Sequence, residues 1–262
     1  MSKIPVALVT GATRGIGRAI VDKLSSKGLC CIMVGSSMES FDLMRQKPLS
    51  ISQDSQWHRG LAIDLAQWPY WTKQTSFSGV HFSGTNETLH KNGKWSLLEM
   101  DNGYDLAMLV NCAGIVQASP SVLCGTEQMQ RLTNVNLLSA ISMCNIASRR
   151  MMRSRRHLVR APCIINISSV LGDPNVDPMP GTSLYSASKA ALAQYSRVLS
   201  AELSRAGVSV HCISPSLVPG TDMIQNLNSM ARSRLEAQFD AEKSHQSPQQ
   251  IAKHVWDIYA SH

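Results

Sequence analysis

Short apolar runs alternate along the chain with longer segments in which apolar residues recur every three or four positions. The apolar runs cover residues 6–10, 29–34, 61–64, 106–111, 163–168 and 208–213. Runs that are apolar at every position are typical of parallel strands covered by helices on both faces. The alternation therefore predicts an α/β fold of the Rossmann type, with a doubly wound parallel sheet of six strands.

The helical segments fill the gaps between these runs, at residues 15–27, 126–152, 185–206, 221–238 and 247–260. Ser247 precedes Pro248, which predicts a capped helix start with proline at the first helical position. No repeat or low-complexity linker divides the chain, so we expect residues 1–262 to form a single domain.

One connection is longer than a crossover helix requires, since 46 residues separate Asp64 from Asn111. We therefore expect an insertion at about residues 66–103. Aromatic residues are concentrated there, and four of the five tryptophans lie between residues 57 and 95. Two interpretations stay open: a surface insertion packed on its own aromatic side chains, or a segment that serves the substrate side or an interface.

The composition is that of a globular protein, because 44% of the residues are hydrophobic and 16% are charged. No apolar run reaches the roughly 20 residues of a membrane span.

The seven cysteines lie mostly in apolar runs and form no Cys-x-x-Cys pair, so we expect reduced core residues and no structural zinc. The chain reaches an apolar run within five residues, which leaves no room for a cleavable targeting segment.

The net charge of +7 comes from one segment. Six arginines and no acidic residue lie between residues 149 and 160, and the other 19 basic residues nearly balance 18 acidic ones. A protein that binds nucleic acid usually spreads its basic residues over a wider face. We therefore expect no nucleic-acid partner.

Three motifs carry candidate chemistry. Residues 10–17 read Thr-Gly-Ala-Thr-Arg-Gly-Ile-Gly between a predicted strand and a predicted helix, where backbone amides can bind a pyrophosphate. Tyr185 and Lys189 are four residues apart on one helix face, so the ammonium should lower the pKa of the phenol. Ser168 and Ser169 end a predicted strand, at the edge where α/β sheets bind ligands.

These motifs, with Asn111-Cys112-Ala113-Gly114 between them, resemble in type and order those of the short-chain dehydrogenase/reductase superfamily. The resemblance implies a catalytic tetrad of Asn136, Ser169, Tyr185 and Lys189. It selects Ser169 because Val-Leu-Gly follows that serine. It also implies a nicotinamide dinucleotide held by Gly11, Thr13, Arg14, Gly15, Ile16, Gly17, Ser36, Ser37, Asp64, Asn111, Ala113, Gly114, Tyr185, Lys189, Val218 and Thr221.

The cofactor is expected to be NADPH/NADP+. Relatives that prefer NAD usually carry an acidic residue after the second strand, where this chain has Ser36 and Ser37. Arg14 stands where NADP-dependent relatives use an arginine against the 2′-phosphate.

Within the superfamily, the chain is most similar to the 3-oxoacyl-[acyl-carrier-protein] reductases, in particular the fungal mitochondrial ones. Residues 5–17, 181–192 and 220–227 carry this similarity, together with Trp68-Pro69. It implies the NADPH-dependent reduction of 3-oxoacyl groups on acyl carrier protein in type II fatty-acid biosynthesis, in the mitochondrial matrix. Because acyl carrier proteins are acidic, the arginines at 149–156 are a candidate docking site, the alternative being a solvated loop tip.

Three departures distinguish the chain from this pattern. Ser216 replaces a glycine after Pro215, residues 173–178 are extra, and the family's last strand is missing. We expect a homodimer or homotetramer. Two other functions stay open: a carbonyl or alcohol reductase of free small ketones, and a catalytically idle dinucleotide-binding subunit.

Overall fold

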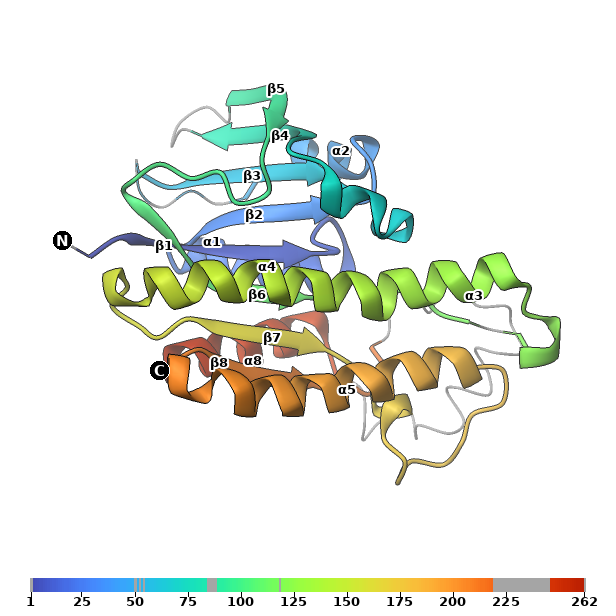
Figure 1. Ribbon diagram of the computed structural model, residues 1–262. Coiled ribbons are helices and arrows are strands. Elements are labelled where there is room, and N and C mark those ends of the chain that lie inside the picture. The colour runs from blue at the N-terminus through green and yellow to red at the C-terminus, as the bar shows by residue number, and fades with distance from the viewer. Residues whose placement is uncertain are drawn as a thin grey trace.

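An eight-stranded sheet forms the centre of the structure (Figure 1). The computed structural model describes residues 2–49, 51, 53, 55–83, 89–117, 119–218 and 246–261. The strand order is β5-β4-β3-β2-β1-β6-β7-β8, and the six strands from β3 to β8 in this order are parallel. The strands are β1 (Ile4–Thr10), β2 (Cys30–Gly35), β3 (Trp57–Ala62), β4 (Phe77–Ser83), β5 (Leu89–Trp95), β6 (Tyr104–Asn111), β7 (Cys163–Ile167) and β8 (Ser209–Ile213).

The prediction of a six-stranded sheet was wrong. Strands β4 and β5 add an antiparallel hairpin beside β3, inside the segment expected to be an insertion. The sequence Leu-His-Lys-Asn-Gly-Lys-Trp of β5 is mostly polar because this strand lies at the sheet edge, so it has no apolar run that would indicate a strand. At the other edge, no strand of the described residues pairs with β8 on its outer side. The helix expected at 221–238 lies outside the described residues.

Helices cover both faces of the sheet, as a doubly wound fold requires. The helices α1 (Gly15–Ser26) and α8 (Pro248–Ala260) pack together on one face, while α3 (Thr126–Thr133), α4 (Ser139–Ser154) and α5 (Ser183–Leu203) lie on the other (Figure 1). A short helix, α2 (Asp42–Gln46), follows β2. Alternate residues of β1 enter two cores: Ala7 and Val9 pack with α1, and Val6 and Leu8 pack with α4.

Two helix predictions were refined by the structure. Ser247 begins α8 through a capping box: its hydroxyl accepts from the Gln250 amide at 3.1 Å, and the Gln250 side chain accepts from the Ser247 amide at 2.7 Å. The segment predicted as one helix at 126–152 contains a π-helical turn, η5 (Asn134–Leu138), between α3 and α4. Such turns are frequent at functional sites.

Some aromatic residues of the third connection pack on β3, while Trp71, Phe77 and Phe82 join the main cores of the sheet. The Arg59 guanidinium lies 4.9 Å from the Trp57 ring centre and 5.1 Å from that of Trp95. Trp57 also stacks on His81 of β4, with ring centres 6.0 Å apart. The insertion also contacts α4 and the π-helical turn: the indole of Trp68 donates to the Ser142 hydroxyl at 2.9 Å, and the Asn134 side chain donates to the Trp68 carbonyl at 3.3 Å. The insertion therefore packs on its own aromatic residues and also on the element that carries Asn136.

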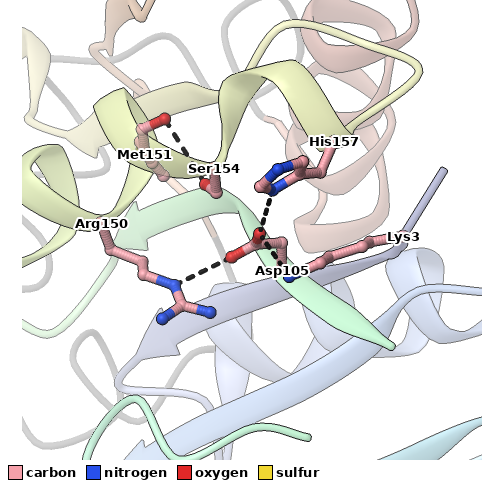
Figure 2. A network of polar contacts seen from close by, with 6 residues as sticks. All are labelled: Lys3, Asp105, Arg150, Met151, Ser154 and His157. Carbon is pink, nitrogen blue, oxygen red and sulfur yellow. Dashed lines mark hydrogen bonds and ion pairs between the residues drawn. The ribbon is translucent and has the colours of Figure 1, made fainter. Parts of the chain in front are cut away.

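A buried carboxylate joins three segments of the chain at the N-terminal ends of the strands (Figure 2). Asp105 of β6 is 2% exposed and accepts from Arg150 of α4 at 2.8 Å. Lys3 and His157 each approach it to 3.3 Å. Burial alone would raise the pKa of this carboxyl, but its hydrogen bonds to His157, Arg150 and Lys3, with the charge of Arg150, lower it below the ordinary value.

No helix in the described part of the chain has the length and apolar character needed to cross a membrane.

Candidate active site

A cleft of about 430 Å³ lies at the carboxyl ends of β1, β2, β3 and β6. The strand order reverses between β1 and β6, which is the point where doubly wound sheets bind dinucleotides. The structure brings most of the predicted cofactor residues into its lining, namely Gly11, Thr13, Arg14, Gly15, Ile16, Gly17, Ser36, Asp64, Ala113 and Gly114. Five others do not line it, namely Ser37, Asn111, Tyr185, Lys189 and Val218, and Thr221 lies outside the described residues.

The glycine-rich loop leaves room for a pyrophosphate. Gly11 and Gly15 have φ of +63° and +54°, a conformation that other residues rarely adopt. A Cβ on Gly11 would lie 2.8 Å from the Ala113 Cα, and one on Gly17 would collide with the Gly11 carbonyl oxygen. The free amides of the first turn of α1 therefore face the cleft without side chains over them. This cradle fits the phosphates of a dinucleotide.

The end of β2 carries no carboxylate that lines the cleft. Ser36 is exposed there, and Arg14 lines the same cleft. Ser37 is engaged locally, because its side chain hydrogen-bonds the Glu39 carboxylate and thereby lowers the pKa of Glu39. The sequence reasoning did not select Arg131 of α3, which lines the cleft.

Two predicted cofactor residues have structural contacts of their own. The Asp64 carboxylate accepts from the Ala66 amide at 3.0 Å and begins a short 3-10 turn. Asn111 is buried, and its side chain donates to the Asn166 side chain at 2.8 Å; neither residue lines the cleft. Thr10, which the sequence reasoning did not select, holds the β6 loop by accepting from the amides of Cys112 and Ala113 at 3.1 Å each.

The four predicted catalytic residues come from three elements. Tyr185 and Lys189 lie on the first turns of α5, Ser169 follows β7, and Asn136 lies in the π-helical turn. Ser169 hydrogen-bonds Tyr185, and the Lys189 ammonium lies 5.9 Å from the centre of the Tyr185 ring. The structure thus brings three of the four together directly.

Asn136 joins this group through backbone contacts. It is 1% exposed, and its side chain accepts from the Ile115 amide and donates to the Ile115 carbonyl, both at 2.9 Å. It also donates to the Ser188 hydroxyl at 3.1 Å, and Ser188 in turn donates to the Tyr185 carbonyl at 2.7 Å. Asn136 therefore fixes the loop after β6 against the first turn of α5.

The ionisation of the Tyr185–Lys189 pair is controlled by burial. Burial raises the pKa of Tyr185 above 10.0, and the hydrogen bond with Ser169 opposes that rise. The expected lowering of the Tyr185 pKa by Lys189 is not observed. The Lys189 ammonium donates to the Ile167 carbonyl at 2.9 Å, and burial lowers its own pKa to about 8. Such a value puts the loss of a proton from Lys189 near neutral pH, where it can serve proton transfer.

Two neighbours explain the position of Ser169. The adjacent Ser168 is buried and donates to the Lys189 carbonyl at 2.8 Å, so it has a structural contact. Gly172 ends the turn after Ser169, and a Cβ there would lie 2.7 Å from the Ala190 amide of α5. Only glycine allows this close approach, which sets the serine beside Tyr185.

The arginine-rich segment lies far from the cleft within one chain. Helix α4 starts beside the π-helical turn and runs to the N-terminal edge of the sheet (Figure 1), about 24 Å for 16 residues. Three of the six arginines between residues 149 and 160 have structural contacts. Arg150 pairs with Asp105, Arg155 donates to the Ala206 carbonyl, and Arg160 lies over the Tyr259 ring. Within one protomer, the candidate docking site for an acyl carrier protein therefore lies away from the cleft.

Comparisons with known proteins agree with this geometry. The family model for short chain dehydrogenase matches residues 5–82 and 99–232, and the unmatched stretch between them contains β5. The short-chain reductase protein NovJ of Streptomyces niveus is 30% identical over 87% of this chain and 74% of its own length. The 3-oxoacyl-[acyl-carrier-protein] reductase of Bos taurus is 29% identical over 85% and 79%.

A solved structure shows the same fold. It is that of a blue fluorescent protein from a metagenomic library, in complex with NADPH, which is 24% identical with a TM-score of 0.74 over 98% of this chain and 91% of that one. Sequence motifs, strand order and cleft therefore agree. The chain belongs to the short-chain dehydrogenase family of nicotinamide-dependent oxidoreductases.

Proposed function

We propose that this protein reduces 3-oxoacyl groups on acyl carrier protein to 3-hydroxyacyl groups with NADPH, in type II fatty-acid biosynthesis. The observation that carries the proposal is the group formed by Ser169, Tyr185 and Lys189 beside a dinucleotide cleft. The substrate class is supported by relatives of that name, including those of Bos taurus and Haemophilus influenzae at 29% and 30% identity.

Each residue of the group has a role that its contacts allow. When bound, the dihydronicotinamide supplies a hydride to the ketone carbon. Tyr185 donates its proton to the carbonyl oxygen, which becomes the hydroxyl of the product. Ser169, within hydrogen-bonding reach of Tyr185, donates to the same oxygen, where negative charge develops. Lys189 places a positive charge beside the phenolate that results, and Asn136 keeps the loop after β6 in register with α5.

The NADPH preference is supported by the ribose end of the cleft. Ser36 and Arg14 lie there, and no carboxylate lines the cleft at the end of β2. A phosphate bound by arginine contributes about 1.5–3 kcal/mol, or roughly 10- to 100-fold in affinity. Arg14→Ala should therefore lower kcat/KM for NADPH by that factor and leave the value for NADH nearly unchanged. Equal kcat/KM for NADH and NADPH in the native enzyme would contradict the preference.

The substrate is tested by comparing two acceptors of the same chain length. We expect a higher kcat/KM with the 3-oxoacyl group on acyl carrier protein than with the corresponding free 3-oxo ester. Equal values would show that the carrier contributes nothing to recognition. No turnover of either acceptor by a protein that binds NADPH would favour an idle dinucleotide-binding subunit instead.

A second function, the reduction of free small ketones, is favoured by one observation. The arginine-rich segment lies at the opposite end of α4 from the cleft, about 24 Å along that helix. Changing Arg153 and Arg156 to glutamate separates the two functions. If these arginines bind the carrier, KM rises for the carrier-linked substrate alone and rises more at low salt.

The location in the mitochondrial matrix is part of the proposal and rests on the resemblance to fungal mitochondrial reductases. Fractionation of cells that express the native gene, with detection of the protein by antibody, tests it. Recovery of the protein outside mitochondria would contradict it.

A further inference from the structure

Gln117 is a fully buried amide that the assigned chemistry does not use. It lies in the loop after β6, is 0% exposed and is absent from the lining of the dinucleotide cleft. A buried amide side chain is costly unless its oxygen and nitrogen both find partners. Both ends of Gln117 have partners, and they belong to two different segments.

The oxygen of Gln117 caps the helix that carries Tyr185. It accepts from the Leu184 amide at 2.7 Å and from the Tyr185 amide at 3.4 Å. These amides belong to the first turn of α5 and have no partner within the helix. Residue Thr182, at the usual capping position, does not cap α5, because its hydroxyl donates to the Met179 carbonyl at 2.8 Å. The cap therefore comes from a residue 67 positions earlier in the chain.

The nitrogen of Gln117 fixes the loop from which the side chain comes. It donates to the Ser119 carbonyl at 2.7 Å. Two residues before Gln117, both backbone groups of Ile115 bond the Asn136 side chain. The loop after β6 is thus tied to the π-helical turn at one point and to the start of α5 at the next.

We propose that Gln117 is a positioning residue that sets the backbone of Tyr185 through this cap. The inference rests on the proposed function, in which Tyr185 donates the proton. A proton donor that is misplaced by about 1 Å loses about 100-fold in rate. The Gln117 oxygen binds the backbone amides of Leu184 and Tyr185. Loss of this cap therefore moves the Tyr185 phenol relative to Ser169 and the substrate.

The test compares two substitutions of similar size. Gln117→Met removes the acceptor and the donor, and it should lower kcat by about 10- to 100-fold with KM for NADPH unchanged within about twofold. Gln117→Glu keeps an oxygen for both amides, at a helix start that favours negative charge, and should retain most of kcat. Ser148→Ala is the control, because it removes a similarly buried hydrogen bond, to the Cys144 carbonyl of α4, away from the site.

Amide hydrogen exchange supplies a readout that needs no substrate. In Gln117→Met, the peptide that covers residues 183–186 should exchange faster than in the native protein and in Gln117→Glu. The inference is overturned if native turnover persists in Gln117→Met, if Gln117→Glu loses as much kcat as Gln117→Met, or if exchange is the same in all three proteins. If the native protein turns over no ketone, the proposed function fails, while the exchange result still decides whether Gln117 holds α5.

Discussion

Lys189 illustrates how one residue can serve chemistry at a cost to stability. Its ammonium is buried and its pKa lies at about 8, because burial disfavours the charged form. In the unfolded chain the ordinary value of 10.5 applies. Below pH 8 both states carry the proton, so the folded state bears the full desolvation cost. Between pH 8 and 10.5 the folded state binds fewer protons, so stability contributed by this group rises with pH.

We therefore expect Lys189→Met to be inactive and yet more stable than the native protein at pH 7. A shift from 10.5 to about 8 corresponds to about 3 kcal/mol, from which the lost bond to the Ile167 carbonyl subtracts about 1 kcal/mol. The gain should shrink as pH rises toward 10, as measured by urea unfolding at several pH values. Lys253→Met, at an exposed lysine, should change stability by less than about 0.5 kcal/mol. Destabilisation of Lys189→Met at pH 7 would contradict the argument.

Tyr185→Phe isolates the proton donor from the fold. The ring and its packing remain, while the hydroxyl that bonds Ser169 is lost. Turnover should fall about 100-fold or more, and NADPH should bind with nearly unchanged affinity, as measured by quenching of protein fluorescence. Lys189→Ala should impair both measurements. Near-native turnover in Tyr185→Phe would show that another group donates the proton.

At the scale of elements, the sequence predicted those strands and helix starts that an apolar run or a short motif marks. The strands at 6–10, 106–111, 163–168 and 208–213 and the starts of α1 and α8 agree with the structure to within about two residues. Strand β3 starts at Trp57, four positions before the predicted run, because His58 and Arg59 are polar residues buried inside it. Strand β5 was missed because an edge strand of Lys, His and Asn has no apolar face to detect.

The candidate site was predictable wherever a residue type is tied to a local motif. The glycine loop and the Tyr185–Lys189 pair lie where the pattern placed them. Gln117 could not be found this way, because its partners are the amides of a helix 67 residues away and no sequence pattern marks a tertiary cap. The side chain of Asn111, expected near the cofactor, instead bonds Asn166 on the neighbouring strand. That contact depends on strand register, which the sequence pattern does not specify.

The Asp105 network ties β6 to α4, to the residue before β1 and to the turn after α4, at the end of the strands remote from the cleft (Figure 2). Asp105→Asn removes a charge that is 2% exposed, while its partners keep access to solvent. We expect a loss of about 1–3 kcal/mol in unfolding free energy and an unchanged kcat. The loss should shrink below pH 3.8, because protonation then removes the same charge. Asp257→Asn, in an exposed pair, is the control, and an equal effect there would contradict this account.

At the scale of the whole molecule, the charge of +7 is concentrated at one end. The arginine-rich segment and the cleft occupy opposite ends of α4 (Figure 1). A carrier docked at the cleft therefore spans the length of α4, contacts the arginines of another protomer, or does not use these arginines. Whether these arginines can bind a carrier docked at the cleft thus depends in part on how protomers assemble. The exposed surface of α4 and α5 is where the assembly can be tested.

Large apolar side chains are exposed on that surface. Val198 of α5 is 47% exposed and Met152 of α4 is 45% exposed, whereas Leu192 and Leu199 of α5 are buried inside the protomer. We expect at least a dimer through α4 and α5, because paired copies would cover these side chains. Val198→Glu should shift the protein toward monomer in light scattering at micromolar concentration. Val159→Glu makes the same change at a residue that is 82% exposed, outside both helices, and should leave the mass unchanged. A monomeric native protein, or equal dissociation of both variants, would contradict this interface.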